Sequence, residues 1–340
     1  MTSLMHREIR GIPDAVDSLL SLGASDIRRA AEALRATDPC LFITVARGSS
    51  DHVATYFKYS SELLLGIPVA SVGPSVASIY GRPLRLRNAA CLAVSQSGRS
   101  PDIVAMARAA RDAGALTLAL TNDLDADLGQ SVAHPLSLHA GTERSVAATK
   151  TFVTSAVAAV WLLAELAQDD DLLDAIKALP EVLHCALAQD WSPVQTAFEG
   201  RNSAFCLGRG PAYAISNECA LKLKETCLIH AESYSSAEVL HGPVSIVEDG
   251  FPVLALTAAD AAEPGLAQVA DDLAGKGARV FATTDQVRLA TPLAWPRSAH
   301  PLTDPLVLVT SFYAMVEALA VSRGIDVDAP RHLDKVTRTT

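Results

Sequence analysis

The second half of the chain repeats the sequence pattern of its first half, and this repeat restricts the possible folds more than any other feature. Four short segments recur in the same order: residues 44–48 and 204–210, 92–96 and 253–258, 114–117 and 277–280, and 133–136 and 299–302. The matched positions 47 and 209, 95 and 257, and 134 and 300 are 162, 162 and 166 residues apart. A single match of this kind is expected by chance, but four in the same order are not. We therefore predict an internal duplication of one structural unit.

Each copy alternates short apolar runs with helical segments. In the first copy, a partly β-branched run over 41–46 predicts a buried strand, and a helix is expected from about 52 to 65. A strand over 90–94, a helix near 102–113 and a strand over 116–120 follow. This alternation predicts an α/β fold of two tandem doubly wound parallel sheets with helices on both faces. We expect five parts: leading helices (1–38), a first domain (39–170), a helical connection (171–200), a second domain (201–326) and a C-terminal tail (327–340).

Composition and charge exclude several functional classes. The 340 residues include 28 Lys and Arg against 38 Asp and Glu, which gives a net charge of −10. A chain this acidic lacks the broad basic surface that nucleic-acid binding needs. The longest apolar stretch, 152–167, is interrupted by polar residues and is shorter than the ~20 residues of a membrane span. It is therefore expected to be a buried helix, and no membrane association is predicted.

Cysteine usage and the N-terminus predict a cytoplasmic protein without cofactors. None of the six cysteines forms a C-x-x-C pair, and most lie in apolar runs, so reduced core residues are expected. Residues 1–10 carry charges of both signs and no apolar run, unlike a signal peptide. No cluster has metal-ligand spacing and no G-x-G-x-x-G motif follows a strand, so neither a metal nor a dinucleotide is expected.

A hydroxyl-rich turn follows the second predicted strand of the first copy. Residues 95–100 supply three serines, a glutamine and a glycine before a predicted helix. Ser49 and Ser50 follow another strand and are expected in the same crevice, because ligands gather at the carboxyl ends of parallel strands. Hydroxyl and N–H groups at a helix start suit a phosphate, although an ordinary capped turn has the same composition. The corresponding turn of the second copy contains an acid, Asp260, so any phosphate site belongs to the first copy.

Three charged residues share one face of a predicted helix in the second copy. Glu218, Lys222 and Glu225 are spaced i, i+4 and i+7. A solvent-exposed, salt-bridged face is the commoner reason for such spacing, but a lysine can also tune a neighbouring carboxylate for proton transfer. His241 lies on a predicted loop, where an imidazole can exchange protons near neutral pH, although most single histidines do not. Lys335 lies in a tail that is either frayed or able to close over a site.

Together these motifs resemble the tandem sugar-isomerase (SIS) family. The resemblance is closest to the isomerase half of glucosamine-6-phosphate synthase and to the stand-alone SIS-type aminosugar-phosphate deaminases. It extends from about Glu8 to the end of the chain. Six motifs in family order carry it: Gly48-Ser49-Ser50, Ser95-Gln96-Ser97-Gly98, Ala147-Ala148-Thr149-Lys150, residues 220–225, residues 237–243 and residues 330–335.

The resemblance implies a role for each matched residue. Glu225 matches the carboxylate that moves a proton between C1 and C2 of the open-chain sugar, Lys222 the lysine beside it, and Glu218 a second carboxylate of the same helix. His241 matches the ring-opening histidine, which in the family comes from the neighbouring subunit, so a homodimer with a shared active site is implied. Lys335 matches the lysine that closes over the substrate. The residues implied in binding the phosphorylated sugar are Ser49, Ser50, Ser95, Gln96, Ser97, Ser100 and, through its backbone, Val146.

Three positions depart from the family pattern. Arg99 and Ser100 stand where Glu-Thr is common, Ala148 replaces a serine, and Arg47 precedes Gly48 where the synthase has a different residue. These changes bear on the identity of the substrate more than on the class of reaction.

The synthase also carries a glutaminase domain, whose nucleophile is a cysteine after the initiator methionine. Here Thr2 follows Met1, and no such domain precedes the isomerase unit. We therefore expect deamination of glucosamine 6-phosphate, or a close aminosugar phosphate, to fructose 6-phosphate and ammonia. The alternatives are an aminotransferase-like activity, a fructosamine-phosphate deglycase activity, and a non-enzymatic sugar-phosphate-binding regulator. A regulator has little need for the residues matched to catalysis, and no basic DNA-binding segment precedes the first repeat.

Overall fold

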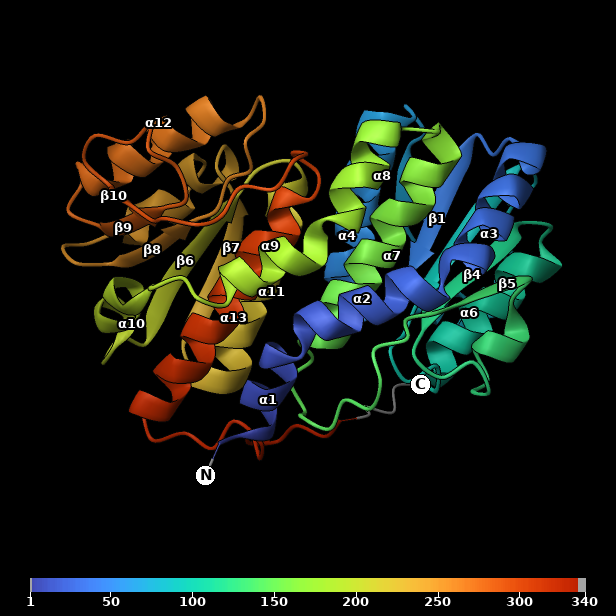
Figure 1. Cartoon of the computed structure of the whole chain (residues 1–340), viewed down its shortest axis with the longest axis horizontal. Coiled ribbons are helices and arrows are strands. Elements are labelled where there is room, and N and C mark those ends of the chain that lie inside the picture. The colour runs from blue at the N-terminus through green and yellow to red at the C-terminus, as the bar shows by residue number, and fades with distance from the viewer. Residues whose placement is uncertain (1, 336–340) are drawn as a thin grey trace. The chain divides into compact units, whose positions relative to one another are not determined.

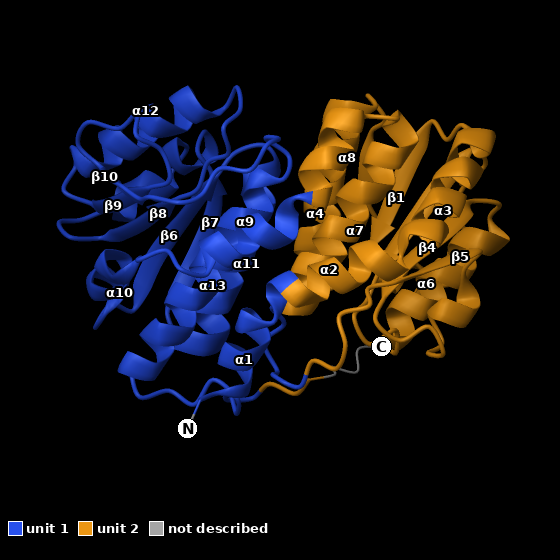
Figure 2. Cartoon of the chain, viewed as in Figure 1, with its two compact units in different colours: residues 1–13, 144–149, 178–332 blue, residues 14–143, 150–177, 333–340 orange. Residues whose placement is uncertain are grey.

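The chain folds into two parallel β-sheets covered by helices on both faces. The computed structural model describes residues 2–335 and contains two five-stranded sheets (Figure 1), which confirms the predicted fold class. The residues group into two compact units (Figure 2). Unit 1 comprises 1–13, 144–149 and 178–332, and unit 2 comprises 14–143, 150–177 and 333–340.

Unit 2 is built on a sheet with the strand order β2-β1-β3-β4-β5. The strands are β1 (Leu41–Val45), β2 (Val69–Ser71), β3 (Ala89–Val94), β4 (Leu116–Thr121) and β5 (His134–Ser137). The helices are α2 (Ile12–Leu22), which begins in unit 1, and α3 (Ala24–Thr37), α4 (Ser49–Leu64), α5 (Ser75–Ser78), α6 (Pro101–Asp112), η1 (Gly129–Ser131), α7 (Lys150–Ala167) and α8 (Asp170–Lys177). Because β1 pairs directly with β3 in parallel, the carboxyl ends of these strands lie side by side.

Unit 1 is built on a sheet with the strand order β10-β9-β8-β6-β7. The strands are β6 (Ser203–Gly208), β7 (His230–Ser235), β8 (Pro252–Ala255), β9 (Arg279–Ala282) and β10 (Thr291–Pro292). The helices are α1 (Leu4–Arg10), α9 (Leu179–Ala186), α10 (Ser192–Phe198), α11 (Pro211–Cys227), η2 (Glu238–Leu240), η3 (Pro243–Ile246), α12 (Glu263–Ala274) and α13 (Asp304–Ser322).

The two sheets share one topology, with β6, β8 and β9 in the places of β1, β3 and β4. The turns after β1 and β6 even have the same backbone angles. Gly48 has φ 54° and ψ −133°, and Gly210 has φ 58° and ψ −138°. Only glycine adopts such angles without strain, so these two positions need it. The predicted duplication is therefore visible in the backbone as well as in the sequence.

One detail of the sequence prediction is wrong. Residues 299–302 form a local turn, in which His300 Nδ1 accepts the amide of Leu302 (3.1 Å), and β10 takes the place of β5 instead. The leading helices expected over 1–38 are present as α1, α2 and α3, and Gly11 and Gly23 separate them by capping α1 and α3.

The two longest helices, α7 and α13, form the centres of the two units. Each is long and apolar enough to cross a membrane, yet 78% of its apolar window is buried within the protein. Helix α7 packs against α3 and α4, and α13 packs against α9 and α11. The prediction of a buried helix over 152–167 is thus confirmed.

Four of the six cysteines are core residues: Cys91, Cys206, Cys219 and Cys227. Burial raises the pKa of the Cys91 and Cys206 thiols to about 12, so these groups stay protonated and unreactive. Cys40 and Cys185 are exposed, so the expectation of a core role does not hold for them.

Candidate functional site

The hydroxyl-rich turn of unit 2 lies where β3 ends and α6 begins. Ser95 follows β3 directly and is 7% exposed, and Ser100 caps α6. Gly98, in the middle of the turn, has φ +64°, and a side chain there would lie 2.9 Å from the Cβ of Ala126. The turn is therefore held in one conformation by close packing against the loop after β4.

Ser49 and Ser50 reach the same edge of the sheet from β1. They form the first residues of α4, directly after Gly48, and both are half-buried. Because β1 and β3 are neighbouring parallel strands, the two serine-containing loops lie at adjacent carboxyl ends. The structure thus brings together the six residues predicted to bind phosphate.

Several polar groups of this turn are available to a ligand. Within residues 2–335, the hydroxyl groups of Ser95 and Ser100 and the side-chain amide of Gln96 form no hydrogen bond. Ser97 Oγ accepts the amide of Arg99 at 3.3 Å. A turn with free donors at the start of a helix is suited to an anion.

Two arginines flank the turn, and both are paired. Arg47, just before Gly48, donates from Nε (3.0 Å) and Nη2 (2.9 Å) to Oδ2 of Asp102 in the first turn of α6. Arg99 donates from Nη2 to Oδ2 of Asp123 at 2.9 Å. The Arg99 pair is largely exposed, whereas Asp102 is fully buried.

In unit 1, helix α11 carries a buried chain of charges. Lys222 Nζ lies 3.0 Å from Glu218 Oε1 and 2.8 Å from Glu225 Oε2. The side chains of Glu218 and Lys222 are completely buried, whereas that of Glu225 is 21% exposed. The three residues predicted to share a helix face are therefore in contact, and they form a buried cluster rather than a solvated face.

The lysine of this cluster stays charged. Burial lowers the pKa of Lys222, but Glu218 and Glu225 raise it by more, so the net pKa lies well above the ordinary value of 10.5. The ammonium is thus paired with both carboxylates at once. Glu225, as the partly exposed member, is the carboxylate that a ligand can reach, and it can accept a proton.

Sequence reasoning missed Tyr313, which completes the cluster. Its hydroxyl donates to Glu218 Oε1 at 2.8 Å from the middle of α13. The two residues are 95 positions apart, and Tyr313 lies in a long apolar run. Its hydroxyl is one of several in a mainly hydrophobic helix, so the sequence did not single it out.

His241 lies on a loop of unit 1, as predicted, between η2 and η3. It is exposed, and among the described residues its imidazole has no hydrogen-bond partner. An exposed imidazole on a short loop is accessible to another molecule, and within residues 2–335 His241 forms no hydrogen bond or ion pair with the α11 cluster.

Val146 lies in a segment held by a second residue that the sequence did not indicate. This segment, 144–149, belongs to unit 1, and Val146 is half-buried. Glu8 of α1 accepts the amides of Arg144 (Oε1, 2.5 Å) and Ser145 (Oε2, 3.2 Å). Glu8 therefore fixes the backbone next to Val146.

Lys335 is paired within unit 2. Its Nζ lies 3.1 Å from Oε2 of Glu143, a carboxylate that is fully buried and also accepts the amide and hydroxyl of Thr151. Residues 336–340 of the predicted tail lie outside the described residues.

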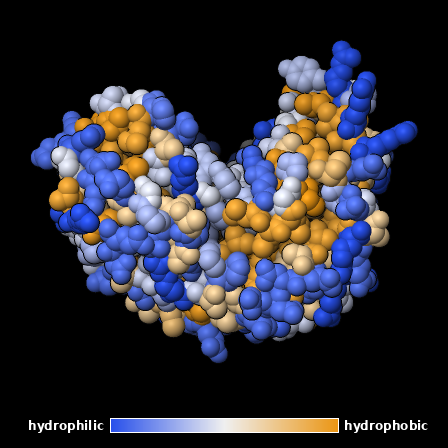
Figure 3. Space-filling view, turned by 90° about the horizontal axis from the view of Figure 1, so that it is seen from above, coloured by the Kyte–Doolittle hydropathy of each residue, from blue (hydrophilic) through white to orange (hydrophobic). Residues whose placement is uncertain are grey.

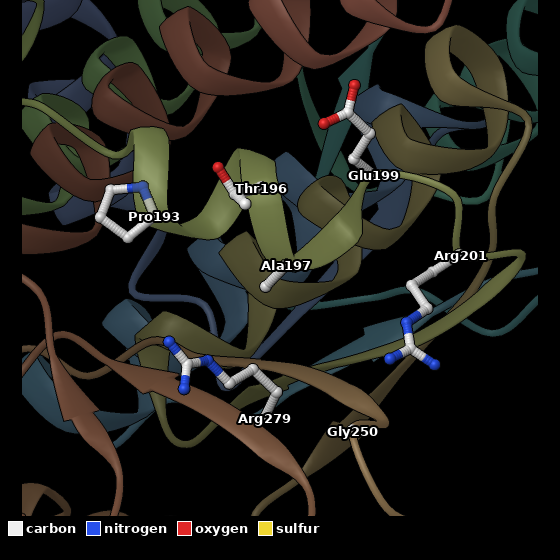
Figure 4. A pocket seen from close by; sticks show the side chains of 7 residues that line it. All are labelled: Pro193, Thr196, Ala197, Glu199, Arg201, Gly250 and Arg279. Atoms are coloured by element: carbon white, nitrogen blue, oxygen red, sulfur yellow. The ribbon is translucent and has the colours of Figure 1, made fainter.

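A separate pocket of about 360 Å³ lies at the amino ends of the unit 1 strands (Figure 4). The guanidinium groups of Arg201 and Arg279 lie at opposite ends of it in this view, and Glu199 points away. None of the predicted site residues lines this pocket. In residues 2–335 no group of three or more His, Cys, Asp or Glu side chains is arranged to hold a metal ion.

Comparison with known proteins places this arrangement in a family. Residues 41–166 and 198–295 match the SIS domain. An isomerizing glutamine–fructose-6-phosphate aminotransferase of Symbiobacterium thermophilum is 32% identical over 96% of this chain and 56% of its own length, so the chain spans about half of that relative.

Two solved structures are similar over the whole chain. A Silicibacter pomeroyi DSS-3 protein provisionally assigned as a phosphosugar isomerase has 61% identity and a TM-score of 0.94, covering 96% of this chain and 100% of that one. A glucosamine-6-phosphate deaminase of Thermotoga maritima has the same fold, with a TM-score of 0.76 and 18% identity, covering 99% of this chain and 100% of that one. The chain therefore belongs to the SIS domain family of phosphosugar isomerases and is related to the isomerase part of the glutamine–fructose-6-phosphate aminotransferases.

Proposed function

We propose that the protein is an aminosugar-phosphate isomerase and deaminase that converts glucosamine 6-phosphate to fructose 6-phosphate and ammonia. The observation that carries the proposal is the α11 cluster, in which a partly exposed carboxylate, Glu225, lies 2.8 Å from the buried ammonium of Lys222. A regulator that only binds a sugar phosphate gains nothing from such a costly buried group, whereas a proton-transfer enzyme needs it.

The proposed reaction begins with ring opening, which we assign to His241. Glu225 then removes the proton from C2 of the open-chain aldose and returns it to C1, which gives the imine of the ketose. Hydrolysis of this imine releases ammonia. One base that serves two adjacent carbons is enough for this step, and a positive charge nearby stabilises the enediol-like intermediate.

Lys222, Glu218 and Tyr313 act as supports in this scheme. Lys222 holds Glu225 in place, because its Nζ also contacts Glu218, which the Tyr313 hydroxyl holds in turn. The proposal assigns phosphate binding to the serine-rich turn of unit 2 and closure over the open chain to Lys335. Closure requires Lys335 to exchange its pairing with Glu143 for the substrate.

The proposal includes a homodimer in the cytoplasm, in which the partner supplies His241. Exposed apolar side chains support a protein partner, because large apolar patches on a surface usually mark an interface. On unit 2 they include Leu63, Ile79 and Tyr80, and Figure 3 shows a continuous hydrophobic area on the half of the molecule that holds this unit.

The decisive experiment is the substitution Glu225→Gln, assayed for ammonia release from glucosamine 6-phosphate. We expect turnover to fall at least about 1000-fold while substrate binding, measured by calorimetry, changes little, because the amide cannot accept the proton. Glu199→Gln, at the pocket of Figure 4, is the control and should leave turnover unchanged. Unchanged turnover in Glu225→Gln would refute the assignment.

The same assay separates the alternatives when the substrate is varied. Ammonia release from phosphorylated aminosugars supports the deaminase, whereas amine release from phosphorylated fructose-amino acids points to a deglycase. Formation of glucosamine 6-phosphate from fructose 6-phosphate and supplied ammonia points to the aminotransferase direction, the direction named for the relative that is 32% identical. Binding of sugar phosphate without turnover of any of these compounds would point to a regulator.

A further inference from the structure

An ion pair joins the two loops that make up the serine-rich edge of unit 2. Arg47 belongs to the loop after β1, two residues before Ser49, and Asp102 follows Ser100 by two residues in α6. Both donors of the contact, Nε at 3.0 Å and Nη2 at 2.9 Å, bind the same oxygen of Asp102. The guanidinium is therefore fixed beside the serines of both loops.

The two partners differ strongly in exposure. Asp102 is fully buried, and its other oxygen accepts the amide of Ile103 at 2.9 Å. The Arg47 side chain is 51% exposed, and its remaining N–H groups have no partner within the described residues. A buried carboxylate that lacks water must be paired with a cation, so Arg47 is held in place while part of its guanidinium faces solvent.

The pair occurs only in the copy that has the serine-rich turn. Arg209 occupies the position of Arg47 in unit 1, 162 residues further on. It is exposed and has no ion pair among residues 2–335, and Pro264 stands where Asp102 would be. The arginine is thus shared by both copies, but the buried acid that fixes it accompanies the serines alone.

We propose that Arg47 is a specificity-determining residue that binds the phosphate of the substrate, and that Asp102 is its positioning residue. This inference rests on the proposed function, which requires a phosphorylated ligand at the serine-rich turn. The serines, the glutamine and the helix start are neutral donors, whereas a phosphate dianion is bound best when at least one donor is charged. Because the chain as a whole has a net charge of −10, that cation has to come from a residue next to the turn.

Arg99 is the matched control, because it lies in the same turn and carries the same charge. Its side chain is 68% exposed and its partner, Asp123, is 35% exposed, so the pair is held only weakly. If any arginine near the turn could bind the phosphate, Arg47→Ala and Arg99→Ala would weaken phosphate binding equally. If the arginine must be held by a buried carboxylate, only Arg47→Ala would weaken it.

The test measures binding of inorganic phosphate and of fructose 6-phosphate to the full chain by titration calorimetry, independently of turnover. We expect Arg47→Ala to weaken both about 10- to 100-fold, the range for loss of a charged hydrogen bond, and Arg99→Ala to weaken them less than about 3-fold. Arg47→Lys should restore part of the affinity. Asp102→Asn should give an intermediate loss.

Arg47→Gln removes the charge, and the double variant Arg47→Gln, Asp102→Asn guards against a folding defect, because it leaves no buried carboxylate without a cation. Both should lose affinity like Arg47→Ala, while the unfolding transition of the double variant stays near that of the wild type. In the activity assay, these variants should raise KM for glucosamine 6-phosphate and change kcat less than about 3-fold.

Each outcome is informative. Wild-type affinity in Arg47→Gln, or equal losses in the Arg47 and Arg99 variants, would overturn the inference and leave the proposed function intact. If the wild type binds phosphate and Arg47→Gln does not, the inference stands even if no aminosugar is turned over. If the wild-type chain binds neither inorganic phosphate nor fructose 6-phosphate, both the inference and the proposed phosphate site fail.

Discussion

The two copies of the duplicated unit share a backbone, but the polar groups of their turns after β3 and β8 are paired in different ways. In unit 2, Ser95, Gln96 and Ser100 keep side-chain donors free. In unit 1, the turn is satisfied from within. Ala259 donates its amide to Asp304 Oδ2 (2.9 Å), and Ala262 donates its amide to Asp260 Oδ1 (2.8 Å). Internal carboxylates thus take the positions that a bound anion would need.

The helices that follow β1 and β6, α4 and α11, also differ, but here the charged residues lie in unit 1. At the separation of 162 residues that relates Gly48 to Gly210, Lys222 of α11 corresponds to Ser60 of α4. The Ser60 hydroxyl is buried and has no partner among the described residues. One copy therefore has a turn with free side-chain donors and no buried charge cluster, and the other has the charge cluster and a turn whose amides are bound by internal carboxylates. A duplicated fold allows each function to be built without compromising the other.

The largest effect on stability and turnover is expected at Lys222, whose counterpart in unit 2 is Ser60. Lys222→Met leaves the buried carboxylate of Glu218 without its cation and should lower the free energy of unfolding by about 3–5 kcal/mol, as well as abolish turnover. Ser60→Ala removes only an unpartnered hydroxyl and should change stability by less than about 1 kcal/mol. Urea unfolding of both variants measures the contrast, and equal losses would show that the two positions are equivalent.

The pKa of Lys222 adds a dependence on pH. Because the folded-state pKa is raised above the ordinary value of 10.5, the ammonium stabilises the fold fully below that value, and the contribution is lost only as the pH rises above it. Titration of Lys222 should therefore add no pH dependence to the stability of the wild type near neutral pH, and stability should fall in strong alkali. Lys222→Met should lack this alkaline component in a pH series of unfolding curves.

A second prediction concerns a substitution that places an internal carboxylate in the turn of unit 2, as in the turn of unit 1. Ser97→Asp places a carboxylate in the turn of unit 2, which should weaken binding of inorganic phosphate at least about 100-fold, because like charges in contact cost several kcal/mol. Asp260→Ser removes the acid from the turn of unit 1 and should leave phosphate affinity and stoichiometry unchanged, since Asp304 still occupies it. Calorimetry that finds a second phosphate per chain in Asp260→Ser would contradict this comparison.

A third prediction concerns the turn after β8 in unit 1, whose amides donate to internal carboxylates. Asp304 is 1% exposed and also accepts the amide and hydroxyl of Ser298 at 2.9 and 2.7 Å. Asp304→Asn replaces an acceptor by a donor that faces these groups and should cost about 2–3 kcal/mol of stability. Asp123→Asn, which breaks only an exposed pair with Arg99, should cost less than about 1 kcal/mol in the same unfolding assay. A small effect at Asp304 would mean that the turn is not held by this carboxylate.

The sequence was sufficient for local patterns and for the repeat, because both depend on residues that are close in the chain or recur at one spacing. It indicated the serine-rich turn and the spacing of Glu218, Lys222 and Glu225, and the structure brings each set together. It did not indicate whether the helix cluster is solvated or buried, since that depends on α13 packing over α11.

Contacts between distant segments could not be predicted for the same reason. Tyr313 meets Glu218 across 95 positions, and Glu8 holds residues 144–145 across 136 and 137 positions. The pairing of Arg47 with Asp102 across 55 positions was equally hidden, although the departure of Arg47 from the family pattern was visible. The wrong match at residues 299–302 has the opposite cause, because similar letters there form a turn rather than a strand.

The smallest effect is expected at Tyr313, which tests how far the α11 cluster depends on its outermost contact. Tyr313→Phe keeps the ring in the core and removes one hydrogen bond to Glu218 (2.8 Å), so stability should fall by about 1.5 kcal/mol. Because Lys222 still links Glu218 to Glu225, kcat for ammonia release should fall less than about 10-fold while KM stays unchanged. If Tyr313→Phe instead abolishes turnover with the fold intact, the hydroxyl takes part in proton transfer itself, and the chemistry of unit 1 extends to α13.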